Sequence, residues 1–145
     1  MTQFATIDTT PVYPLAAQPG AVEMLNVMIE AAARYPGLVV QRGTTWDGGL
    51  AEADHLTGVI TISPAANRAE TRCALLACLL HLVQGATDDE EADQRAVREQ
   101  VARILAPRSV LPADLDDVDV DALAGQMGVD LRTARLSIEL ARSAR

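Results

Sequence analysis

The most constraining feature of this sequence is an apolar stretch of helix length, Cys73 to Val83, which is interrupted only by His81. Before it, Asn67 and Glu70 have the three-residue spacing of a reciprocal helix cap, and Gly85 stands where such a helix would end. A helix without a polar face must be buried on all sides. We therefore predict a central helix around which the rest of the chain packs.

The residues before this helix predict one helix and two short strands. Apolar residues recur at helical spacing from Ala21 onward, and the turn residues at 36–37 end that pattern. Strands are expected near residues 38–40 and 59–62, with a glycine-rich loop over residues 42–53. The apolar residues of the first helix are Val22, Leu25, Met28, Ile29 and Ala32.

The residues after the central helix predict three more helices. Thr87 and Glu90 have capping-box spacing and open a helix that runs to about Leu105. Its apolar stripe places Gln94 on the inward face. Helices over 120–127 and 131–143 follow, separated by Gly128, Val129 and Asp130.

These elements define an α+β fold in which a small β-sheet packs on a buried central helix and further helices enclose both. The chain has 145 residues and is 49% hydrophobic, which suits one globular domain. Residues 1–20 contain three prolines and no helical period, so we expect an extended arm followed by a single domain over residues 21–145.

The charge and hydropathy of the chain argue against nucleic acid and membranes as its partners. The formal net charge is −8, which repels nucleic acid phosphates. No apolar run reaches the roughly 18 residues of a membrane span, and no basic segment followed by an apolar one begins the chain. Cys73 and Cys78 are poorly placed for a disulfide within one helix and are expected as buried free thiols. We therefore expect a cytoplasmic protein with no membrane partner.

The order of elements resembles a known family. A strand, a short loop and Glu70-x-Arg72 lead into a buried helix that ends in His81, and this layout is similar to the ImmA/IrrE family of zinc metallopeptidases of phages and mobile elements. The following helix and the C-terminal helix pair extend the resemblance over about residues 58–140. It implies a zincin-like fold in which two His of an H-E-x-x-H helix bind zinc, its Glu activates water and a later Glu completes the site.

The motif positions are mostly replaced in this chain. His81 matches the second histidine, whereas Ala77 stands at the first, Cys78 at the general base and Gln94 at the downstream Glu. Alanine has no donor atom, and a neutral amide binds Zn²⁺ poorly. A catalytic zinc site needs about three protein ligands. We therefore expect no catalysis and no zinc cofactor, with His81 and Cys78 as the only weak metal candidates.

One alternative alignment stays open at this point. If Glu90, Glu91 or Glu99 faces His81 in place of Gln94, two of the three zinc ligands are retained. Otherwise we expect His81 to be a core histidine that is hydrogen-bonded to a carbonyl or to Gln94.

Two further features point to partners. The segment from Ala124 through Gly128 to Arg135 has the spacing of a helix-turn-helix, with Arg132 and Arg135 on its second helix. Aspartates over residues 114–130 surround that helix with the wrong sign for phosphate, so we favour packing or protein contact over DNA binding. Trp46, in the glycine-rich loop, is either a partner anchor or a lid on the core.

Together these features lead to one functional hypothesis and two alternatives. The resemblance implies an inactive, peptidase-like protein of a phage or mobile element that binds a protein partner, such as a repressor or a host regulatory protein. The first alternative is an active metalloprotease of that family that cleaves a repressor. The second is a small helix-turn-helix DNA-binding regulator.

Overall fold

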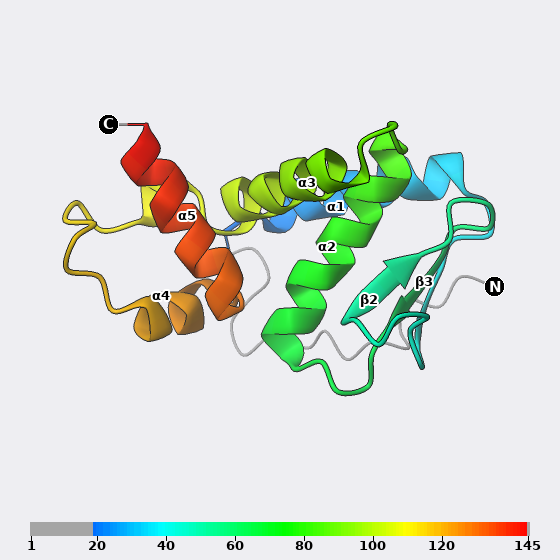
Figure 1. Cartoon of the computed structure of the whole chain (residues 1–145), viewed down its shortest axis with the longest axis horizontal. Coiled ribbons are helices and arrows are strands. Elements are labelled where there is room, and N and C mark those ends of the chain that lie inside the picture. The colour runs from blue at the N-terminus through cyan, green and yellow to red at the C-terminus, as the bar shows by residue number, and fades with distance from the viewer. Residues whose placement is uncertain (1–18, 145) are drawn as a thin grey trace.

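The structure is a computed structural model that describes residues 19–144 and confirms the α+β class (Figure 1). Most of the predicted arm, residues 1–18, lies outside the described residues. No helix in the described part of the chain combines the length and apolarity needed to cross a membrane. The elements are α1 (Ala21–Arg34), β1 (Val39–Arg42), β2 (Ala51–Ala53), β3 (Val59–Ile62), α2 (Arg68–Gln84), α3 (Glu90–Leu105), a 3₁₀ turn (Arg108–Val110), α4 (Val120–Met127) and α5 (Leu131–Ser143).

The three strands form a mixed sheet in the order β1-β3-β2. β1 pairs with β3 in parallel, with Val39 opposite Val59, and both of these strands were predicted. β2 pairs with β3 in the antiparallel sense and was predicted to be loop. Its sequence, Ala51-Glu52-Ala53, holds no β-branched or aromatic residue, so pairing with β3 rather than local propensity makes it a strand.

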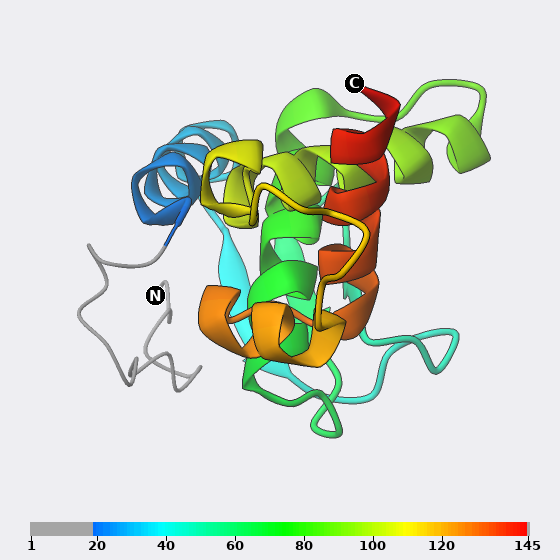
Figure 2. The same cartoon turned by 90° about the vertical axis from the view of Figure 1, so that its left-hand side faces the viewer.

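The α2 helix separates two hydrophobic clusters. Its residues Cys73, Leu76 and Leu80 pack with residues of α3, α4 and α5. On the other side Leu75 and Leu79 pack with the sheet and with α1. Figure 1 shows α2 between the sheet and the α4–α5 pair, and Figure 2 shows α1 to one side of α2 with the α4–α5 pair in front of it. This position explains why the helix has apolar side chains on opposite faces.

Side-chain caps fix where most helices begin. The predicted cap of α2 is present, because Asn67 Oδ1 accepts from the Glu70 N–H at 2.8 Å and a Glu70 carboxylate oxygen accepts from the Asn67 N–H at 3.0 Å. Asp119 caps α4 and Asp130 caps α5 in the same way, each accepting an N–H three residues on. Two of the aspartates around the C-terminal helix pair therefore stabilise helix starts.

The predicted cap of α3 was wrong. Asp89 is the N-cap residue and accepts from the Ala92 N–H at 3.0 Å. The Thr87 hydroxyl instead donates to Asp93 at 2.7 Å, and the Thr87 N–H donates to the same carboxylate at 2.8 Å. Thr87 and Asp89 are both residue types that cap helices, and in the structure Asp89 is the one that caps α3.

The α1 helix turns an apolar stripe outward. Val22, Leu25 and Ile29 are 66%, 53% and 61% exposed, although the sequence gives them core-like spacing. Met28 packs on the sheet-side cluster as the spacing suggests, together with the fully buried Ala31. Apolar residues therefore lie on more than one face of α1, and only one of those faces is covered by the described residues.

Arg72 links three segments that are distant in sequence. Its guanidinium donates to the Met127 carbonyl at 2.7 Å, to the Gly128 carbonyl at 3.2 Å and to the Pro19 carbonyl at 2.7 Å. The first two acceptors lie at the C-terminal end of α4, where helix carbonyls lack partners and favour a positive charge. This contact joins the start of α2 to the turn between α4 and α5 and to the segment before α1.

We expect Arg72→Met to lower the free energy of unfolding by about 1–3 kcal/mol, because three carbonyls lose a charged donor. Urea denaturation of the full chain measures the change. The control is Arg103→Met, which removes an exposed ion pair with Glu99 and should cost less than about 1 kcal/mol. Equal losses for the two variants would contradict a structural role for Arg72.

Candidate functional site

A cavity of about 330 Å³ lies along one face of α2. Glu70, Ala74, Ala77 and His81 line it, and their spacing of four, three and four residues places them on a single helical stripe. These residues are half-buried. The prediction that α2 is buried on all sides was therefore wrong along this stripe, where two alanines are too small to fill the space beside the helix. We call this space the α2 cavity.

The other walls of the α2 cavity come from three different elements. α3 contributes Gln94 and Arg98, and α5 contributes Arg132. Leu50 and Ala51 border it at the start of β2. The remaining lining residues are Cys73, Cys78, Val97, Val101, Asp130, Thr133 and Leu136. Residues from distant parts of the sequence thus meet at one hollow.

The four positions singled out in the sequence by resemblance to a zinc-binding motif all line the α2 cavity. Ala77, Cys78 and His81 come from α2, and Gln94 faces them from α3. Only His81 and Cys78 among them carry a side chain that binds zinc well, and two ligands are too few for a catalytic site. Among the described residues, no three His, Cys, Asp or Glu side chains are grouped closely enough to hold a metal ion. The donor set around His81 therefore does not fit a catalytic zinc.

Gln94 occupies a different position from the one predicted. Its side chain is exposed at the rim of the cavity rather than turned into the core, and its amide donates to Glu90 at 3.4 Å. The predicted hydrogen bond between His81 and Gln94 is absent, and the His81 ring makes none with any residue from 19 to 144. His81 is therefore a half-buried cavity residue and not a satisfied core histidine.

Burial is the main influence on the charge of His81. It lowers the pKa of the imidazole below its ordinary value, and the nearby His55 lowers it further, while Asp93 acts in the opposite direction. The net shift is downward, so the ring is neutral at pH 7. The cavity consequently contains a neutral imidazole.

Both cysteines are free and buried, as the sequence predicts. Burial raises the pKa of the Cys78 thiol to about 12, with Glu52 contributing in the same direction. Burial also raises the pKa of Cys73, whose sulfur accepts from the Thr133 hydroxyl at 3.5 Å. A thiol is nucleophilic as the thiolate, so neither cysteine has the electrostatic environment of a catalytic nucleophile.

The loop that carries Trp46 is fixed by its own hydrogen bonds. The Trp46 N–H donates to both carboxylate oxygens of Glu52 at 3.0 Å, and the Thr45 hydroxyl donates to the Gly49 carbonyl at 2.7 Å. Trp46 itself is 93% exposed. It does not cover the core, so the lid interpretation was wrong.

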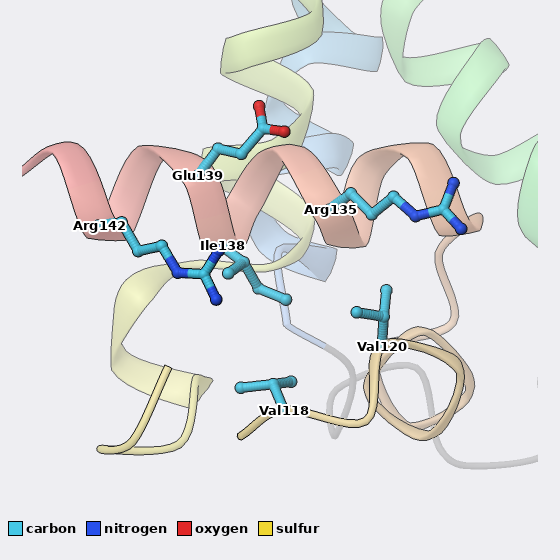
Figure 3. Close-up of a pocket in the computed structure, with 6 residues that line it drawn as sticks. All are labelled: Val118, Val120, Arg135, Ile138, Glu139 and Arg142. Atoms are coloured by element: carbon cyan, nitrogen blue, oxygen red, sulfur yellow. The ribbon is translucent and has the colours of Figure 1, made fainter. Parts of the chain in front are cut away.

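The C-terminal helix pair matches its predicted bounds, and it divides the basic residues of α5 between two cavities. Arg132 borders the α2 cavity. Arg135 borders a second cavity of about 130 Å³, in which Val118, Val120 and Ile138 face one another (Figure 3). Arg142, beside that second cavity, donates to the Leu115 carbonyl at 2.6 Å.

Comparison with known proteins gives no relative: no family model, curated protein or solved structure matches this chain.

The sequence identified Ala77, Cys78, His81 and Gln94 as site residues but gave no role to Arg98. This residue lies four positions after Gln94, so the two share a face of α3. That spacing could have identified Arg98 once Gln94 was singled out. The contribution of Leu50 and Ala51 could not be found in this way, because it depends on β2.

We expect the chain to lose stability as the pH falls below about 6.5, the ordinary histidine pKa. His81 binds a proton more weakly in the folded state, so its protonation favours unfolding, and the loss grows until the pH reaches the lowered pKa. Thermal unfolding of wild type and His81→Gln at about pH 7.5 and 5.5 measures this effect. The variant should show a smaller decline.

The control for this measurement is His55→Gln, which replaces the exposed histidine and should retain most of the wild-type decline. If His81→Gln retains the full decline, the burial of His81 is not its source.

Proposed function

We propose that this chain is a cytoplasmic, catalytically inactive peptidase-like protein of a phage or mobile element, and that it acts by binding a protein partner in the α2 cavity. A repressor or a host regulatory protein is the class of partner that the resemblance to the ImmA/IrrE family implies. The observation that carries the proposal is the meeting of Ala77, Cys78, His81 and Gln94 at one cavity. The place of a catalytic centre is kept while its chemistry is replaced.

The edge of the sheet beside this cavity supports binding of an extended segment. β2 is an edge strand, and Ala51 at its start lines the α2 cavity. An edge strand offers backbone N–H and C=O groups to a further strand, and side chains of that strand can enter a neighbouring pocket. A partner segment can therefore pair with β2 while one of its side chains occupies the space above Ala74 and Ala77.

The Trp46 loop supplies a second element of such an interface. Tryptophan is enriched among the residues that contribute most to protein–protein binding. Because the loop is already fixed by Glu52 and by its internal hydrogen bond, little conformational entropy remains to be lost when a partner orders it. We assign Trp46 as an anchor outside the cavity.

Restoring the missing zinc ligands tests the peptidase-like origin of the cavity. We expect wild type, purified without chelator, to contain no stoichiometric zinc, because His81 and Cys78 together are too few ligands. Ala77→His with Gln94→Glu provides three ligands on the cavity walls and should bind about one zinc per chain. Elemental analysis after dialysis measures the metal.

The control for zinc binding is Ala96→His with Gln94→Glu. Ala96 is exposed on α3 and does not line the cavity, so this variant has the same composition without the same geometry. A folded Ala77→His, Gln94→Glu variant that binds no zinc would contradict the assignment of these positions. Stoichiometric zinc in wild type would overturn the inactive assignment.

Filling the cavity tests the binding role. Ala77→Trp places an indole in the hollow and should abolish capture of the partner from cells of the source organism. Trp46→Ser should weaken it by about tenfold or more, as expected for an anchor residue. Cross-linking followed by mass spectrometry identifies proteins that wild type captures and Ala77→Trp does not.

The control for this measurement is Ala96→Trp, on the exposed side of α3, which should capture the same proteins as wild type does. A partner that Ala77→Trp retains does not use the cavity, and this result would contradict the proposal.

A further inference from the structure

Most of the arginines in residues 19–144 are engaged. On α3, Arg95 pairs with Glu91 and Arg103 with Glu99, each four residues earlier. Others are held by backbone carbonyls, as Arg72 is. Arg98 and Arg132 make no hydrogen bond or ion pair with any residue of the same described range, and both line the α2 cavity. Arg98 is half-buried there.

The absence of a partner for Arg98 follows from Gln94. Position 94 lies one helical turn before Arg98, where the other two α3 arginines have a glutamate. A glutamate four residues before an arginine forms a favourable helix pair, whereas glutamine leaves the cation uncompensated. The replacement that removes the third zinc ligand of the family therefore also leaves a free guanidinium at the cavity.

The two acidic side chains that line the same cavity already accept hydrogen bonds at helix starts. The Glu70 carboxylate accepts from the Asn67 N–H at the start of α2. The Asp130 carboxylate accepts from the Thr133 N–H at 2.8 Å at the start of α5. Each lies at a helix N-terminus, where the helix dipole stabilises a negative charge. Both carboxylates keep their negative charge, but of the four Arg, Asp and Glu side chains that line the cavity only Arg98 and Arg132 have no partner among the described residues.

We infer that the α2 cavity binds an acidic protein segment, whose Asp or Glu carboxylates pair with Arg98 and Arg132 while a neighbouring apolar side chain fills the space above Ala74 and Ala77. This inference rests on the proposed function and names the chemistry of the partner. Guanidinium and carboxylate match in planar geometry and form charge-assisted hydrogen bonds. Arg98 is half-buried and therefore gains more from such a pair than the exposed Arg132 does.

The test is selection of a displayed library of random short peptides on the full chain. The selected peptides should be enriched in Asp and Glu beside an apolar residue. Binding of the best selected peptide, measured by calorimetry, should weaken by at least about tenfold in Arg98→Gln and in Arg132→Gln. Gln94→Glu should weaken it as well, because the new carboxylate would pair with Arg98.

Matched controls are Arg95→Gln and Arg103→Gln, which remove the same charge from α3 outside the cavity and should bind the peptide as wild type does. Circular dichroism and thermal unfolding verify that each variant is folded. Peptides selected without acidic enrichment would overturn the inference, and so would selection of no binding peptide. A single-stranded oligonucleotide that competes equally well would overturn it too, by showing general anion binding.

The same peptides separate this inference from the proposed function. If Ala77→Trp abolishes binding while Arg98→Gln and Arg132→Gln leave it unchanged, the cavity is a docking site and the acidic chemistry is wrong. If Ala77→Trp also leaves binding unchanged, both the inference and the proposed docking site fail.

Discussion

The rest of the structure depends on the burial of α2 between two hydrophobic clusters. Leu76 faces the helical side and Leu79 faces the sheet side, and both are fully buried. Burying a leucine side chain contributes about 1.5–3 kcal/mol to the stability of the fold, so each of the two clusters independently stabilises the position of α2. With two opposite faces fixed in this way, the orientation of the remaining stripe is no longer free. That stripe carries Ala74, Ala77 and His81, and its small residues make the cavity possible.

The elements predicted well are those whose signals are local. The bounds of α4 and α5 follow from an aspartate before each helix and a glycine between them, and Gly128 indeed has a positive φ of 67° that suits glycine. The buried residues Val97, Val101 and Leu105 of α3 also have the helical spacing that the sequence predicts for its core face. In contrast, β2 and the outward face of α1 depend on which neighbour covers them. Periodicity gives the spacing of apolar residues but not their partners.

The candidate site was predictable in part for a related reason. The resemblance in layout selected Ala77, Cys78, His81 and Gln94 as site residues. Helix spacing then predicts which side chains of one helix point in similar directions, so residues of the same helix could be grouped from the sequence. It could not show that Gln94 lies at the rim with its amide on Glu90, or that Arg132 reaches the same cavity. Those facts depend on how α3 and α5 cross α2, and the packing of the helical cluster sets that crossing.

The residues that share the α2 cavity with His81 set its charge as well as its capacity to bind a metal ion. A zinc peptidase site combines a divalent cation with carboxylates that ligate it and activate water. The α2 cavity instead places Cys78, a neutral thiol, and Gln94, a neutral amide, around His81. Because Gln94 carries no charge, Arg98 lacks the carboxylate partner four residues earlier that Arg95 and Arg103 have. The neutral side chain at position 94 therefore has two effects: it gives His81 no carboxylate with which to share a metal ion, and it leaves Arg98 available to the acidic groups that we propose as its ligand.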